Sequence, residues 1–159
     1  MNHLIDIRDG VTELSLDTPE FTEEVQAQVD ALEQKIMDMP PADCPVVHRF
    51  TPGLYIREIL MPKGTLITSK IHLTEHPYVI SKGVVCVFIE GVGWKKYAAP
   101  YTGITKPYTR RVLFIEEDTI WTTFHPTDET DLAKLEEQLI LRRDDHLKNM
   151  ATIECGGEA

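Results

Sequence analysis

The sequence has little of several features that mark particular classes of protein. Its 159 residues include three cysteines, Cys44, Cys86 and Cys155, whose odd number and wide spacing exclude a disulfide framework and a zinc knuckle. No apolar run approaches the roughly 18 residues that a membrane span needs. The N-terminus lacks the basic and then apolar pattern of a signal peptide. These absences predict a protein that is not secreted by a signal peptide and stays in a reducing compartment, with Cys86 as a small core residue.

Positive charge is also scarce. Sixteen Lys and Arg residues stand against 26 Asp and Glu residues, which gives a formal net charge of -10. Binding to nucleic acid without sequence preference needs a basic face, and an anionic membrane surface attracts cations. The charge balance therefore predicts neither nucleic acid nor membrane as a partner.

Common catalytic motifs are missing too. The sequence has no Gly-x-Ser-x-Gly, no phosphate-binding Gly-rich loop and no His-Glu-x-x-His. The acidic trio at 116–118 follows a predicted strand and is interpreted as a solvated turn. The sequence therefore predicts no catalytic residue.

What is present divides the chain into three sections. Residues 1–44 form an extension with a helix over about 18–39, residues 45–125 form strands, and residues 126–159 form a second helix and a loose tail. Turn-forming residues, among them 81–83 and 116–118, separate the short apolar runs and favour an antiparallel sandwich or barrel. The predicted strands are 46–50, 54–60, 66–72, 78–81, 84–90, 93–98, 110–115 and 119–125.

The N-terminal helix has an apolar stripe at heptad spacing. Thr18, Pro19 and Glu20 are typical of a helix start. Two interpretations of the stripe are open: it packs on the barrel of its own chain, or it meets copies of itself or another subunit. The second predicts a homo-oligomer whose contact residues are Val25, Val29, Leu32, Ile36 and Met39.

The C-terminal helix has a more modest apolar stripe. Leu132, Leu135 and Leu139 recur at helical spacing and are followed by Ile140. Acidic residues precede this stripe and basic residues follow it, which suits the helix dipole.

The stretch from Gly64 to Gly83 resembles the first signature of the cupin β-barrels, in which a His-x-His pair and a glutamate lie between two glycines. His72 matches the second histidine, Lys70 stands in place of the first, and His76 stands in place of the glutamate. The resemblance covers about residues 45–125 and implies a mainly β fold, a cupin-type antiparallel jelly-roll barrel with a helix before it and a helix after it.

The second cupin signature is weaker, because Arg111 or Val112 replaces its histidine. The resemblance implies a metal centre, and His72, His76 and His125 are the candidate ligands for a divalent transition metal.

Lys70 and Arg111 oppose a metal, and two interpretations of them are open. They contact an anion or a sugar phosphate, or they pair with acids such as Glu58, Glu75 or Glu116 in a salt-bridged barrel interior with no ligand. The favoured interpretation has no cofactor, with His72 hydrogen-bonded inside the barrel or at its rim and His76 on the surface.

Three segments, residues 50–58, 70–72 and 117–127, resemble a narrower group of cupin-like proteins encoded in phages and prophages. Membership implies a non-enzymatic, oligomeric structural or decorating component of the virion, with itself and other virion proteins as partners. It would be found in the virion or the host cytoplasm. The alternatives are a metal-dependent cupin enzyme, a small-anion or sugar binder that uses the barrel interior, and an accessory protein that acts on the host.

Overall fold

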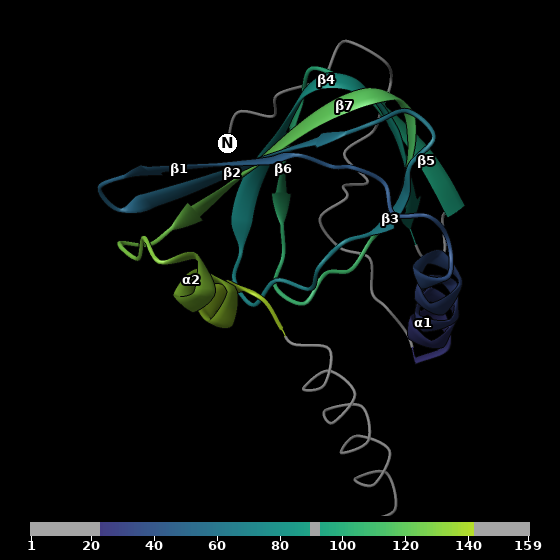
Figure 1. The fold of residues 1–159 in the computed structure, drawn as a ribbon, viewed down its shortest axis with the longest axis horizontal. Coiled ribbons are helices and arrows are strands. Elements are labelled where there is room, and N and C mark those ends of the chain that lie inside the picture. The colour runs from purple at the N-terminus through teal and green to yellow at the C-terminus, as the bar shows by residue number, and fades with distance from the viewer. Residues whose placement is uncertain (1–22, 90–92, 142–159) are drawn as a thin grey trace, which may run out of the picture.

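The computed structural model describes residues 23–89 and 93–141 (Figure 1). Seven strands lie between two short helices. The elements in chain order are α1 (Glu23–Met37), β1 (Val46–Thr51), β2 (Leu54–Met61), β3 (Leu66–Thr68), β4 (His76–Ile89), β5 (Gly93–Ala98), β6 (Tyr101–Thr105), β7 (Val112–Pro126) and α2 (Leu132–Leu139).

The strands form one antiparallel sheet in the order β1-β2-β7-β4-β5, with β3 added to β7 and β6 added to β4. β4 and β7 are by far the longest strands and pair with each other along most of their length. Both strands bend and then continue, so each pairs with different short strands before and after its bend. The sheet therefore curls into a barrel. This arrangement confirms the predicted cupin-type jelly roll with a helix at each end.

The main core fills the inside of this curled sheet. Its residues alternate along the long strands with outward-facing neighbours, as a pleated strand requires. The buried members are Met61, Tyr78, Ile80, Val85, Val87, Tyr97, Leu113, Ile115 and Trp121. Cys86 is half-buried on the other face, where its thiol donates to Glu116, so the predicted core role of this cysteine is wrong.

Two predicted turns are bends inside continuous strands. Residues 81–83 lie within β4 and residues 116–118 lie within β7, where Lys82 pairs with Ile120 and Val84 with Glu117. Gly83 has a φ of +96°, and the register shifts around it. The two segments of turn-forming residues lie opposite each other in paired strands. Both strands therefore bend at the same place and continue, and neither reverses its direction as a turn would require.

The region around the predicted strand 66–72 also differs. β3 ends at Thr68, and residues 69–73 make single contacts instead: the Ser69 amide donates to the Arg111 carbonyl, and His72 forms an isolated bridge with Ile140. β6 was not predicted, because its short sequence has weak alternation. β7 begins at Val112, so residues 110–111 lie outside it.

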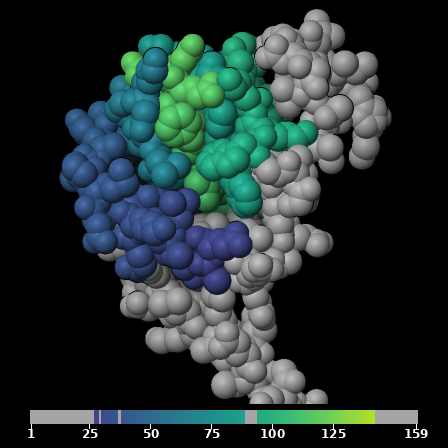
Figure 2. Space-filling view, turned by 90° about the vertical axis from the view of Figure 1, so that its right-hand side faces the viewer, coloured from purple at the N-terminus to yellow at the C-terminus, as the bar shows by residue number. Residues whose placement is uncertain are grey.

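α1 packs beside β3 through polar contacts (Figure 2, purple segment). Arg110 is buried and pairs with Asp30 and Glu33, both at 2.6 Å. The Thr68 hydroxyl donates to the other Glu33 oxygen at 2.7 Å. These contacts fix the helix on its own barrel.

The predicted stripe of α1 is only partly described. Leu32 and Ile36 are half-buried, whereas Met39 lies beyond the end of the helix and is 59% exposed. The side chains of Val25 and Val29, and the predicted helix start at 18–20, lie outside the described residues. The oligomer contact therefore stays a prediction.

α2 lies across one open end of the barrel (Figure 1). Asp131 caps it by accepting hydrogen bonds from the amides of residues 133 and 134. Leu135 and Leu139 are buried against Tyr55, while Leu132 is 45% exposed, so the inward stripe is narrower than predicted. The predicted loose tail lies outside the described residues. Neither described helix is long and apolar enough to cross a membrane.

Candidate metal centre and ligand cavity

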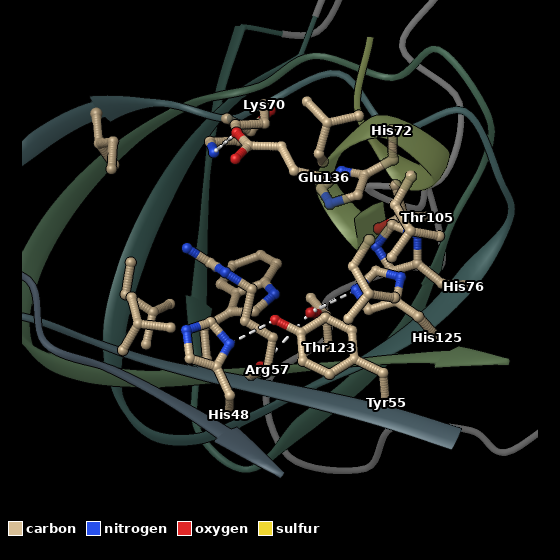
Figure 3. A pocket seen from close by; sticks show the side chains of 18 of the residues that line it. His48, Tyr55, Arg57, Lys70, His72, His76, Thr105, Thr123, His125 and Glu136 are labelled. Atoms are coloured by element: carbon tan, nitrogen blue, oxygen red, sulfur yellow. Dashed lines mark hydrogen bonds and ion pairs between the residues drawn. The ribbon is translucent and has the colours of Figure 1, made fainter. Parts of the chain in front are cut away.

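A cavity of about 480 Å³ opens between α2 and the inner face of the sheet (Figure 3). Its walls come from all the strands except β5 and from α2, together with the segments that join β3 to β4 and β6 to β7. Aliphatic side chains and Trp121 make much of the lining. Polar groups gather in two places: three histidines at one side, and a mixed group around Arg57 at the other.

The three histidines are the predicted candidates, His72, His76 and His125. Each offers one ring nitrogen, and these nitrogens lie within 4.8 Å of one another. His76 begins β4, His125 stands near the end of β7, and His72 is held by its bridge to Ile140. The predicted surface position of His76 is wrong, because the residue is 1% exposed.

Hydrogen bonds fix which nitrogen is available on two of the rings. The Nδ1 of His76 lies 3.0 Å from the Thr74 carbonyl oxygen, which can only accept, so Nδ1 carries the proton and Nε2 keeps a lone pair. The Nε2 of His125 lies 2.9 Å from the Thr123 hydroxyl oxygen, which in turn lies 3.5 Å from the Arg57 carbonyl oxygen. Because that carbonyl can only accept, the Thr123 proton is assigned to it. His125 therefore donates from Nε2, and its buried Nδ1 has no hydrogen-bond partner among the described residues.

The environment keeps all three rings neutral. Burial lowers the pKa of His72 to about 2, with further lowering from the neighbouring histidines and from Arg57 and Arg111. Burial and the charge of nearby groups lower the pKa of His125 to about 3. Burial also lowers the pKa of His76, although its bond to Thr74 opposes the shift. Neutral imidazoles are the protonation state that ligates metals.

The donor set fits a first-row transition metal. Imidazole nitrogens suit zinc, copper, iron and nickel. Two nitrogens that each lie about 2.1 Å from one tetrahedral ion are about 3.4 Å apart, so a pair at the 4.8 Å limit must close by about 1.4 Å when the ion binds. The orphaned Nδ1 of His125 is the kind of buried polar atom that a metal satisfies. Within the described residues the cluster contains no carboxylate.

Tyr55 joins the histidine cluster to the other polar group. Its ring stacks on His125 with centroids 5.6 Å apart, and its hydroxyl lies 2.6 Å from Nδ1 of His48. Burial raises the pKa of Tyr55, so the phenol keeps its proton. Neither Tyr55 nor His48 was predicted. The signal for Tyr55 was the inward alternation of residues 55, 57 and 59 on β2.

The predicted anion contacts lie in different surroundings. Lys70 does not point at the metal position: its ammonium pairs with Glu136 at 2.8 Å, at the exposed rim of the cavity. The strand has already ended at Thr68, so the alternation that would turn Lys70 inward does not apply. Arg111 is buried in the lining, where it bonds to the Thr105 hydroxyl and lies over the Tyr78 ring.

No family model matches the chain, and no curated protein does either. Solved structures with a similar fold include cupin proteins. A cupin-2 domain protein of Shewanella frigidimarina is 9% identical, with 64% of this chain and 98% of that chain covered and a TM-score of 0.42. A cupin superfamily protein of Desulfitobacterium hafniense is 6% identical, with 57% and 83% covered and a TM-score of 0.45.

A salicylate 1,2-dioxygenase of Pseudaminobacter salicylatoxidans is 12% identical, with 82% of this chain and 42% of that chain covered and a TM-score of 0.49. At identities this low the likeness concerns the fold alone.

Proposed function

We propose that this cupin-fold protein binds one divalent transition metal through His72, His76 and His125 and uses it to hold a small molecule in the cavity. The observation that carries the proposal is the convergence of three neutral imidazoles, one of which, His125, has a buried Nδ1 with no hydrogen-bond partner among the described residues. Three protein ligands leave positions for solvent or a substrate, as in catalytic rather than structural metal sites.

Each residue of the site has a defined task in this proposal. A bound metal would supply Lewis acidity, polarising an oxygen of the ligand. Thr74 and Thr123 orient the rings of His76 and His125 by accepting their N–H groups. Leu135 and Leu139 of α2 cover the cavity and exclude water from it. Tyr55 holds a proton on its hydroxyl beside His48, within the same cavity.

The test is metal analysis of the purified protein after loading and removal of excess ion. We expect about one equivalent in the wild type and its loss in His72→Ala and His76→Ala. His48→Ala is the matched control, since His48 lines the same cavity outside the cluster and its loss should leave the metal in place. A wild type that retains no transition metal, or equal loss in the control, would refute the proposal.

A second candidate function is the non-enzymatic virion role that the phage resemblance implies. The half-buried Leu32 and Ile36 and the exposed Met39 support a contact with another subunit. Replacing Leu32 and Ile36 with Asp should lower the sedimentation coefficient of an oligomer. Mass spectrometry of purified particles should find the chain at many copies. Particles without it would overturn the virion role and leave the accessory role in the host.

A further inference from the structure

Arg57 stands at the centre of the cavity's second polar group. On β2 it pairs with His48 on one side and with Thr123 on the other, so the three side chains form one row across the sheet. All three line the cavity, and Figure 3 shows Arg57 beside His48. The row lies one inward-facing step along the strands from the pair of Tyr55 and His125.

Arg57 is half-buried, and its guanidinium has no ion-pair or hydrogen-bond partner among the described residues. This differs from the other cations nearby. Arg49 pairs with Glu58 at 3.4 Å, and Lys70 pairs with Glu136. A guanidinium drawn out of water without a partner is costly, whereas a bidentate contact with a carboxylate compensates it.

The charge of the lining favours an anion. Among the described residues that line the cavity, Glu136 is the one carboxylate, and it is engaged by Lys70 at the rim. Arg57 therefore leaves a positive charge in the lining of a chain whose formal net charge is -10. This local reversal of sign concentrates small anions at the cavity.

The remaining wall selects the body of that anion. Much of the rest of the lining is apolar and includes Ile59, Met61, Trp121, Leu135 and Leu139. Inorganic anions and polyols have nothing to bury there, while a flat or branched hydrocarbon does. A volume of about 480 Å³ holds a small organic molecule and falls in the range of ligand pockets.

We infer that the cavity binds a small organic acid with an apolar body, whose carboxylate lies on Arg57. The contact between Arg57 and the carboxylate is inferred from the cavity lining alone and needs no metal. Its extension, that a second oxygen of the same ligand meets the metal, rests on the proposed function.

The test uses calorimetric titration of the zinc-loaded protein with three probes: benzoate, benzyl alcohol and acetate. Benzoate should bind at least about tenfold more tightly than benzyl alcohol, which lacks the charge, and than acetate, which lacks the ring. Arg57→Gln should weaken benzoate by about tenfold or more and remove its advantage over the alcohol, and Arg57→Lys should restore part of it.

Arg49→Gln is the matched control, because Arg49 lies on the neighbouring strand, outside the cavity lining. It should leave all three affinities unchanged, and melting curves check that each variant is folded. Benzoate that binds no better than benzyl alcohol, or that binds Arg57→Gln as well as the wild type, overturns the inference, as does a wild type that binds no benzoate at millimolar concentrations.

Titration of the metal-free protein separates the two proposals. The protein could fail to retain any metal and still bind benzoate in a way that depends on Arg57. That result would support the inference and refute the proposed function. A protein that retains metal but shows no preference for benzoate would refute the inference alone.

Discussion

His76 and His125 face each other across β4 and β7, with their ring centroids 4.4 Å apart. Tyr78 pairs with Thr123 in the register of these strands, so two further residues along each strand bring the two histidines opposite one another. Cross-strand neighbours on one face contact directly. Residues far apart in the sequence thus form the fixed part of the candidate metal centre, and His72 completes it from a segment outside the strands.

Acid should destabilise the metal-free protein. The pKa of His72 falls from 6.5 in the unfolded chain to about 2, and that of His125 to about 3, in both cases chiefly through burial. Below pH 6.5 the unfolded chain therefore binds more protons than the folded one, and the free energy of unfolding falls as pH is lowered. Urea titrations between pH about 7 and 5, with a chelator present, measure this slope.

Replacing one histidine shows whether the slope arises in the cluster. Each histidine that takes up a proton only on unfolding contributes about 1.4 kcal/mol per pH unit. His72→Gln should therefore flatten the pH dependence, while Lys70→Gln, two residues away at the exposed rim, should not. Equal slopes in His72→Gln and the wild type would contradict the expected burial of a neutral ring.

Removing the two carboxylates around Arg110 should be more damaging than removing an exposed one. The Arg110 side chain is 5% exposed, and Asp30 with Glu33 compensates its charge. Asp30→Asn combined with Glu33→Gln leaves a buried cation, which costs about 3 kcal/mol or more. Asp38→Asn, exposed just beyond α1, should cost little. Chemical denaturation measures both, and equal losses would mean that the pairs do not hold α1.

Gly83 and Gly64 both adopt a backbone conformation that favours glycine, but only Gly83 is also crowded by neighbouring atoms. Both have a positive φ, +96° and +84°. A Cβ at Gly83 would lie 2.4 Å from the Asp118 carbonyl oxygen, whereas a Cβ at Gly64 meets nothing within 4 Å. Gly64→Ala should therefore cost about 1 kcal/mol for the backbone conformation alone. Gly83→Ala should cost several times more, because β7 must shift, and similar melting temperatures for the two variants would contradict this account.

Leu135 and Leu132 test how α2 closes the cavity. Leu135 is 2% exposed and packs on Tyr55, while Leu132 on the same helix is 45% exposed. Leu135→Ala should lower the free energy of unfolding by about 2–4 kcal/mol, since it opens a cavity under the helix. Leu132→Ala should cost less than about 1 kcal/mol. Limited proteolysis should also cut α2 faster in the first variant, and equal cutting rates would argue against this packing.

Local patterns in the sequence were sufficient for the class of fold. Alternation along β1, β2 and β5 predicted strands close to those observed. They failed at residues 81–83 and 116–118, because a bend shared by two paired strands has the same composition as a reversal of the chain. They also failed at residues 69–72, which a bridge to Ile140 holds outside any strand.

The candidate site was predicted only in part, because local patterns do not show which distant segments pack together. His72, His76 and His125 were nominated together, but the predicted exposure of His76 was wrong, because burial depends on what packs over the end of the barrel. Arg57 and Tyr55 were missed, since a strand residue in an amphipathic pattern gives no sign of which side chains stand opposite it.

The sequence by itself determined the class of fold, the net negative charge and the identity of the three histidines, because these depend on composition and on neighbours along the chain. The tertiary structure alone decided that Lys70 turns to Glu136 at the rim and that Arg57 lines the cavity with no carboxylate paired to it among the described residues. The register of β1, β2 and β7 places Arg57 between His48 and Thr123, and register is fixed by packing between strands far apart in the sequence.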